Sequence, residues 1–131
     1  MNKKIFIASD IKNIKRVVDE IISLLNGARI NESDIFDIRL CMEEALINAV
    51  KYGNKFDKKL NVLIDFTYDN SKVTISVEDE GKGFDYHKLP DPTKEENLLT
   101  GSGRGVFLIR HLMNELRFNK KGNRLTMVKY I

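Results

Sequence analysis

The segment from Glu32 to Tyr52 most constrains the fold, because its apolar residues surround almost the whole circumference of a helix. One stripe repeats at alternating spacings of three and four residues, and its members are Ile35, Ile38, Met42, Ala45 and Ala49. The other side carries Leu40, Cys41 and Ile47. We therefore expect this helix to be buried on both faces.

Two polar residues one turn apart, Glu44 and Asn48, interrupt the second apolar face. Burial of a carboxylate or an amide without a partner is unfavourable, so both side chains need partners in the folded protein. Asn48 can offer an oxygen ligand to Mg²⁺, and Glu44 can accept a proton from a water or hydroxyl that attacks a γ-phosphate. The alternative, a solvent-facing pair on an ordinary helix, is weakened by the apolar flanking residues.

The other periodicities predict strands grouped together with helices beside them. We expect strands over 2–8, 60–68, 72–79, 116–118 and 125–131, and helices before 27, over 32–52 and over 104–115. The first helix should begin at a cap on Ser9 or Asp10 and end at Gly27 in the left-handed conformation. The second should begin at a cap on Asn31 or Ser33 and end at Gly53. Asp69 to Ser71 and Lys121 to Asn123 supply the hairpin turns. This order predicts an α+β two-layer sandwich, with a mostly antiparallel sheet and three helices on one face.

Length and composition narrow the class of protein. The 131 residues fit a single domain over 1–131, and 42% hydrophobic with 31% charged residues is ordinary for a soluble globular protein. A net charge of +3 with interspersed signs argues against a nucleic-acid surface, and the basic stretch Lys51–Lys59 is interpreted as a solvated loop and strand start. The single cysteine, Cys41, is assigned to the core, and no segment has the length of a membrane span, so we expect a cytoplasmic protein.

A second candidate cluster follows the strand over 72–79. Asp79 ends this strand, and Gly81 and Gly83 come next in the order Asp-x-Gly-x-Gly. A carboxylate there can accept a hydrogen bond from an exocyclic amine such as the adenine N6, while glycines let the backbone approach a base closely. A plain turn after a hairpin strand explains the same residues and is favoured for this motif taken alone.

The third cluster precedes the last helix and contains Gly101, Ser102, Gly103, Arg104 and Gly105. Glycines here let backbone N–H groups face an anion, and the N-terminus of the helix adds a favourable dipole. No Lys-Ser/Thr follows, so this is not a Walker loop. The alternatives are a flexible loop before a helix and an ordinary surface arginine at its start.

Together, EEALINAVKYGN, DEGKGF and GSGRGVFLIRHLMNEL resemble the N box and the two glycine boxes of the GHKL (Bergerat-fold) ATP-binding superfamily. The short lid and the ending NRLTMVKYI resemble its anti-sigma factor serine/threonine kinase branch. The resemblance implies ATP and Mg²⁺ as cofactors, Glu44 as catalytic base, Asn48 as Mg²⁺ ligand and Asp79 as adenine reader. It also implies nucleotide contacts at the glycine positions Gly81, Gly83, Gly101, Gly103 and Gly105, with Ser102 and Arg104 in the same cluster.

The branch resemblance further implies a kinase that phosphorylates a small STAS-type anti-sigma-factor antagonist, binds a sigma factor and forms a homodimer. From the charge balance and segment lengths we expect no direct contact with nucleic acid or membrane. The sequence departs from the branch at Tyr52, where histidine is common, and at Gly101, where some members carry an arginine. A nucleotide-dependent binding module without catalysis is the second hypothesis. A sensor histidine kinase is disfavoured because the chain has no room for a dimerising helical hairpin.

Overall fold

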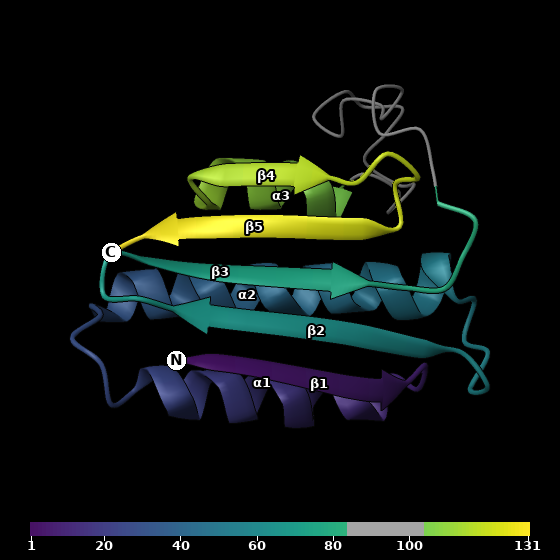
Figure 1. Cartoon of the computed structure of the whole chain (residues 1–131), viewed down its shortest axis with the longest axis horizontal. Coiled ribbons are helices and arrows are strands. Elements are labelled where there is room, and N and C mark those ends of the chain that lie inside the picture. Colours follow the sequence, from purple (N-terminus) through teal and green to yellow (C-terminus); the bar gives the residue numbers. More distant parts are fainter. Residues whose placement is uncertain (84–103) are drawn as a thin grey trace.

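The computed structural model describes residues 1–83 and 104–131, except for the side chain of Arg104. The elements, in order, are β1 (Asn2–Ala8), α1 (Lys12–Leu25), α2 (Glu32–Ile47), the π-helix η1 (Asn48–Gly53), β2 (Asn61–Tyr68), β3 (Lys72–Glu78), α3 (Arg104–Leu112), β4 (Glu115–Phe118) and β5 (Arg124–Tyr130). All strand pairings are antiparallel, and the sheet has the order β1-β2-β3-β5-β4. The helices α1, α2 and α3 cover one face of it (Figure 1), which confirms the predicted α+β two-layer sandwich.

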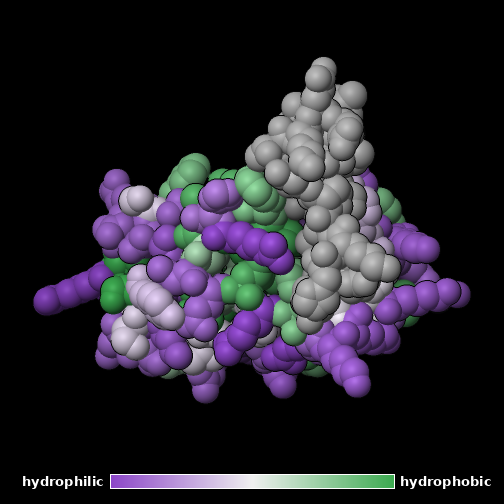
Figure 2. Space-filling view, turned by 90° about the horizontal axis from the view of Figure 1, so that it is seen from above, coloured by the Kyte–Doolittle hydropathy of each residue, from purple (hydrophilic) through white to green (hydrophobic). Residues whose placement is uncertain are grey.

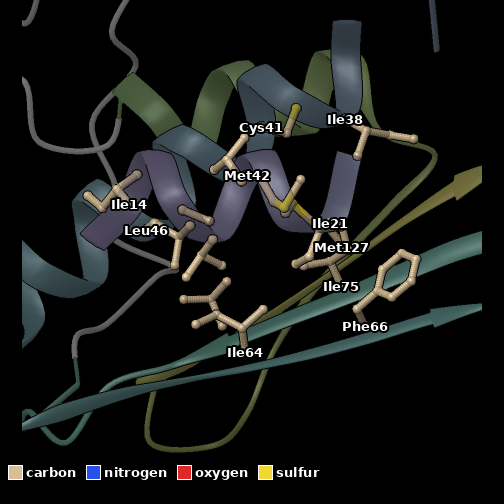
Figure 3. Close-up of a cluster of buried hydrophobic side chains, with 14 of the residues drawn as sticks. Ile14, Ile21, Ile38, Cys41, Met42, Leu46, Ile64, Phe66, Ile75 and Met127 are labelled. Carbon is tan, nitrogen blue, oxygen red and sulfur yellow. The ribbon is translucent and has the colours of Figure 1, made fainter. Parts of the chain in front are cut away.

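Strand register places one apolar row across the face of the sheet that the helices cover. Residues paired from strand to strand along this row are Ile5, Ile64, Val77, Leu125 and Phe118. The neighbouring row contains Phe66, Ile75 and Met127, which meet α1 and α2 in the core (Figure 3). The alternate positions face away from the helices and are largely polar, as the hydrogen bond between the Ser76 and Thr126 hydroxyl groups (2.8 Å) illustrates.

The central helix α2 packs against α1 on one side and α3 on the other. Ile38, Cys41, Met42 and Leu46 are fully buried on it, so the prediction of burial on both faces is confirmed. Burial raises the pKa of the Cys41 thiol to about 12, which keeps it protonated as a small core residue. No helix in residues 1–83 or 104–131 combines the length and apolar character needed to cross a membrane.

The structure corrects the expected helix over 32–52. Regular α-helix ends at Ile47, and Asn48–Gly53 continue as a π-helix in which the Asn54 N–H donates to the Ala49 carbonyl at 2.8 Å. The apolar pattern could not reveal this change, because Ala49, predicted on the apolar stripe of a regular helix, is buried in the π-helix as well. Turns of this kind occur frequently at functional sites.

Two predicted helix ends also differ. Gly27 does not have the left-handed conformation, since α1 ends with Asn26 in the right-handed region. Ser9 does not cap α1, because its hydroxyl donates to the Leu60 carbonyl, whereas the Asp10 carboxylate accepts from the Lys12 N–H at 3.2 Å. Asn31 caps α2 as predicted, accepting the Asp34 N–H at 2.7 Å.

The last helix is shorter than predicted. α3 stops at Leu112 rather than Glu115, and Glu115 opens β4. Sheet pairing takes precedence here, because the Asn114 N–H already donates to the Val128 carbonyl of β5 at 2.8 Å.

β4 forms one edge of the sheet and has four residues. The face of the molecule on this side shows hydrophobic patches between hydrophilic residues (Figure 2). Short edge strands leave few free backbone groups for pairing with another chain.

Candidate nucleotide-binding site

A cavity of about 790 Å³ lies between η1, the turn after β3, the start of α3 and the turn that joins β4 to β5. Cofactor-sized ligands occupy pockets of this order. Four of the predicted site residues lie in its wall, namely Asn48, Asp79, Gly81 and Gly83. The fold thus brings the N-box helix and the first glycine motif, about thirty residues apart in the chain, to one cavity.

Asp79 is held by hydrogen bonds on both its side chain and its backbone. Its carboxylate accepts the Gly81 N–H at 2.8 Å. Its backbone N–H donates to the Asn123 carbonyl at 3.0 Å, and the Asn123 side-chain amide donates to the Asp79 carbonyl at 2.8 Å. Burial raises the pKa of the Asp79 carboxyl, while the bond from Gly81 acts in the opposite direction. A fixed, half-buried carboxylate of this kind can accept a hydrogen bond from a ligand amine.

Close backbone packing makes this arrangement possible. A Cβ on Gly53 would lie 2.3 Å from the carboxylate carbon of Asp79, and one on Gly81 would lie 2.3 Å from the Gly53 carbonyl oxygen. Gly83 has φ +80°, and a Cβ there would reach the carbonyl oxygen of Lys121. Backbone neighbours therefore require glycine at Gly81 and Gly83, and at Gly83 the backbone conformation does so too. A side chain on Gly53 would instead displace the Asp79 carboxylate.

Glu44 and Gly105 lie beside the cavity, outside the wall as far as the described residues define it. A Cβ on Gly105 would be 2.8 Å from Glu44 Oε2 and 3.1 Å from Asn48 Nδ2. The start of α3 therefore packs directly on the two polar side chains that α2 and η1 present. The third motif meets the first at this point.

Comparison with known proteins decides the family. Residues 7–129 match the family model of the histidine kinase-like ATPase domain. The chain belongs to this family. The predicted GHKL-type resemblance is thereby confirmed, and membership of this ATPase family implies the use of ATP.

Curated relatives agree with this assignment, and a solved structure shares the fold. Serine-protein kinase RsbW of Staphylococcus aureus strain JH9 is 35% identical over 106 residues, covering 75% of this chain and 67% of the relative. A second Staphylococcus aureus sequence of the same name is 36% identical over the same length. The crystal structure of the RsbU and RsbW domains of a Mycobacterium tuberculosis protein superposes with a TM-score of 0.68 at 20% identity, over 99% of this chain and 32% of that chain.

Part of the predicted site of this histidine kinase-like ATPase domain lies outside the described residues. Gly101, Ser102 and Gly103 belong to that segment, and Arg104 begins α3 with a side chain that is likewise not described. The predicted phosphate contacts of these four residues therefore stay predictions.

Metal ligands are few in the described part of this ATPase domain. No three His, Cys, Asp or Glu side chains there are close enough to hold an ion together. Asn48 lies in the cavity wall, and its amide carries one oxygen that can serve as a ligand. This donor set fits Mg²⁺, which usually keeps several waters and takes nucleotide phosphates as its other ligands.

Several cavity residues were missed from the sequence. Tyr52, whose side chain is 46% exposed, lies in the wall and can stack on a base, and the Lys51 ammonium is 5.2 Å from its ring centre. Asn54 and Asn123 line the cavity too. Tyr52 and Asn54 flank Gly53 in the N-box segment, so their position in the sequence could have indicated a place in the site. Asn123 lies outside the N box and the two glycine boxes, and the pairing of β5 with β3 brings it to Asp79.

Proposed function

We propose that this chain is an ATP- and Mg²⁺-dependent serine/threonine protein kinase of the partner-switching kind, acting in the cytoplasm. Its substrate would be a small STAS-type anti-sigma-factor antagonist, and it would also bind a sigma factor and associate as a homodimer. Residues 1–131 would act as one nucleotide-binding domain. The cavity that unites Asn48, Asp79, Gly81 and Gly83, in a chain related to proteins named serine-protein kinase, carries the proposal.

In this proposal the residues divide into binding and transfer roles. The Asp79 carboxylate accepts a hydrogen bond from the amine of adenine. The backbone at Gly81 and Gly83 lies against the base and sugar. Asn48 supplies an oxygen ligand to Mg²⁺, which when bound neutralises phosphate charge. The N-terminus of α3, with Gly105 and the glycines before it, favours the phosphates electrostatically.

Glu44 would receive the proton of the attacking serine or threonine hydroxyl. Its Oε2 lies at the start of α3, where Gly105 leaves no room for a side chain between the two. Phosphoryl transfer depends mainly on positioning and charge neutralisation, so a single base next to a bound nucleotide is sufficient protein chemistry.

Transfer of radiolabelled γ-phosphate from ATP to a cognate STAS-type regulator tests the proposal, with Glu44→Gln as the matched variant. We expect the variant to bind ADP as the wild type does and to lose about 10²- to 10⁴-fold in transfer rate, the usual contribution of a general base. An undiminished rate would remove Glu44 from this role.

A nucleotide-dependent binding module without catalysis is the second candidate. The position of Glu44 beside the cavity rather than in its described wall favours this reading. Calorimetry that shows ATP binding together with no phosphate transfer to any tested regulator would establish it and end the kinase proposal.

A further inference from the structure

We propose that Asn54 is a positioning residue that fixes the Asp79 carboxylate and thereby sets the preference of the site for adenine over guanine. This inference rests on the nucleotide site of the proposed function. It assigns to Asn54 a role through Asp79, one that is separate from any contact of its own with the base.

The Asn54 side chain is 2% exposed and connects segments that are far apart in the chain. Its Nδ2 donates to Ser9 Oγ at 2.8 Å and to the Asn61 carbonyl at 3.0 Å. Its Oδ1 accepts the Glu80 N–H at 2.8 Å. Both donor hydrogens of the amide and its carbonyl oxygen are thus used, which holds the side chain in one orientation.

This anchoring acts on the residue next to Asp79. The Glu80 backbone is held by Asn54, and the Glu80 carboxylate accepts the Asn61 N–H at the start of β2. Gly53, the residue before Asn54, lies against the Asp79 carboxylate. One buried amide therefore links the end of η1, the end of β1 and the start of β2 to the turn that carries Asp79.

Asp79 is held from its other side by the turn between β4 and β5. The Asn123 side chain and backbone bond to the Asp79 carbonyl and N–H. Asn123 restrains the backbone from the C-terminal hairpin, and Asn54 does so from the N-terminal half. Without the Asn54 side chain the Glu80 N–H loses its partner, while the bonds from Asn123 and the strand pairing of β3 remain. The turn and its carboxylate therefore gain freedom while the fold persists.

Base selectivity is the property most sensitive to that freedom. Adenine presents an amine at position 6 and guanine a carbonyl oxygen, so a fixed carboxylate attracts the first and repels the second. Sites built to hydrogen-bond one group discriminate strongly, because the wrong ligand leaves a buried polar group unpaired. A carboxylate that can move away discriminates less, since it loses the adenine bond and relieves the guanine repulsion together.

The test measures the dissociation constants of ADP and GDP by calorimetry for wild type, Asn54→Ala, Ser9→Ala and the control Ser76→Ala. We expect Asn54→Ala to weaken ADP binding about tenfold, the effect of one to two hydrogen bonds, and to lower the preference for ADP over GDP by at least about fivefold. Ser9→Ala removes one anchor of Asn54 and should cause a smaller change in the same direction. If Asn54→Ala does not fold, Ser9→Ala still tests the inference. Ser9 is outside the cavity wall defined by the described residues, so its replacement removes no wall side chain.

Ser76→Ala is the matched control, because it removes a hydroxyl hydrogen bond of similar burial on the other face of the sheet. It should lower the melting temperature and leave the ADP to GDP ratio unchanged. An unchanged ratio in the folded Asn54 and Ser9 variants, or an equal fall in the Ser76 variant, overturns the inference while the nucleotide site stands. Failure of the wild type to bind ADP overturns both.

Discussion

The carboxyl group of Asp79 is half-buried, and its pKa is raised by this burial. When the pKa of a carboxyl group is higher in the folded than in the unfolded protein, its protonated form favours folding. This contribution to stability is complete below the pKa of the unfolded state and is lost as the pH rises through the pKa of the folded state. At neutral pH the charge therefore opposes folding. Binding of an amine would favour the same charge, so stability and function make opposite demands on this residue.

Replacement of Asp79 by Asn should separate the two demands. At neutral pH the nucleotide-free variant should melt at a higher temperature than wild type, with the difference shrinking as the pH falls below the ordinary Asp value of about 4. ADP affinity should fall about 10- to 100-fold, as for loss of a hydrogen bond to a charged group. Calorimetric melting and ADP titration check both, and a destabilised variant with normal ADP affinity would contradict the assignment.

Gly53 admits a second test at this scale. A Cβ there would sit 2.3 Å from the Asp79 carboxylate carbon, so Gly53→Ala should displace that side chain, reduce ADP affinity and destabilise the fold by about 1–3 kcal/mol. Gly27→Ala is the control, because its nearest neighbouring atom would be 4.0 Å away. Urea unfolding and ADP titration should distinguish the two variants, and equal behaviour would show that the close approach is not needed.

Among the elements, those with strong periodicity were predictable. The apolar spacing in α1 and α2 and the alternation in β2 and β3 each have one face to bury, so sequence alone indicates them. The π-helix was not predictable, because it differs from an α-helix in its backbone hydrogen bonds, which side-chain spacing does not specify. The stop of α3 at Leu112 depends on pairing with β5, a contact that local sequence does not encode.

The contact between α3 and α2 gives an element-scale prediction. Gly105→Ala raises intrinsic helix propensity by up to about 1 kcal/mol, yet its Cβ would meet Glu44 Oε2 at 2.8 Å. We expect unchanged helix content by circular dichroism, with weaker ATP binding and slower phosphate transfer because the added methyl group displaces the Glu44 and Asn48 side chains. Wild-type ATP binding and transfer in this variant would show that the close packing is dispensable.

Lys129 on β5 joins three elements. Its side chain is 13% exposed, and its ammonium donates to the Leu112 carbonyl at the end of α3 (2.6 Å) and to Asp37 of α2 (3.2 Å). Lys129→Met leaves the carbonyl and the carboxylate without this donor, so the free energy of unfolding should fall by about 1–3 kcal/mol.

Lys15→Met is the control for that change, because the Lys15 side chain is 86% exposed and its pair with Asp19 is a surface one. Its effect should stay within about 0.5 kcal/mol. Denaturant unfolding measures both variants, and equal losses would show that the position of Lys129 between elements adds nothing.

On the scale of the whole molecule, the sequence indicated which motifs would meet but not what holds them in place. The spacing of Asn48, Asp79 and Gly81 was enough to expect one site. Asn54 and Asn123 were missed because their partners are distant in the chain: Ser9 is 45 positions from Asn54, and Asp79 is 44 from Asn123. Such bonds depend on tertiary contacts rather than on any local pattern.

Nucleotide binding should stabilise the molecule as a whole. ADP at about 100 times its dissociation constant adds about 2.7 kcal/mol, which for a protein of this size raises the melting temperature by roughly 10 °C. A thermal shift assay with Mg-ADP measures this, with Asp79→Asn at the same ADP concentration as the control, whose shift should be half that of the wild type or less. Absence of a shift in the wild type would exclude the nucleotide site.

The sheet order has a consequence for synthesis of the protein. β5 lies between β3 and β4, and the turn before it supplies Asn123 to Asp79. During translation, the N-box helix and the Asp79 turn leave the ribosome well before their last supporting strand. The nucleotide pocket can therefore form only after β5 has emerged, so a nascent chain that lacks β5 should be unable to capture ATP.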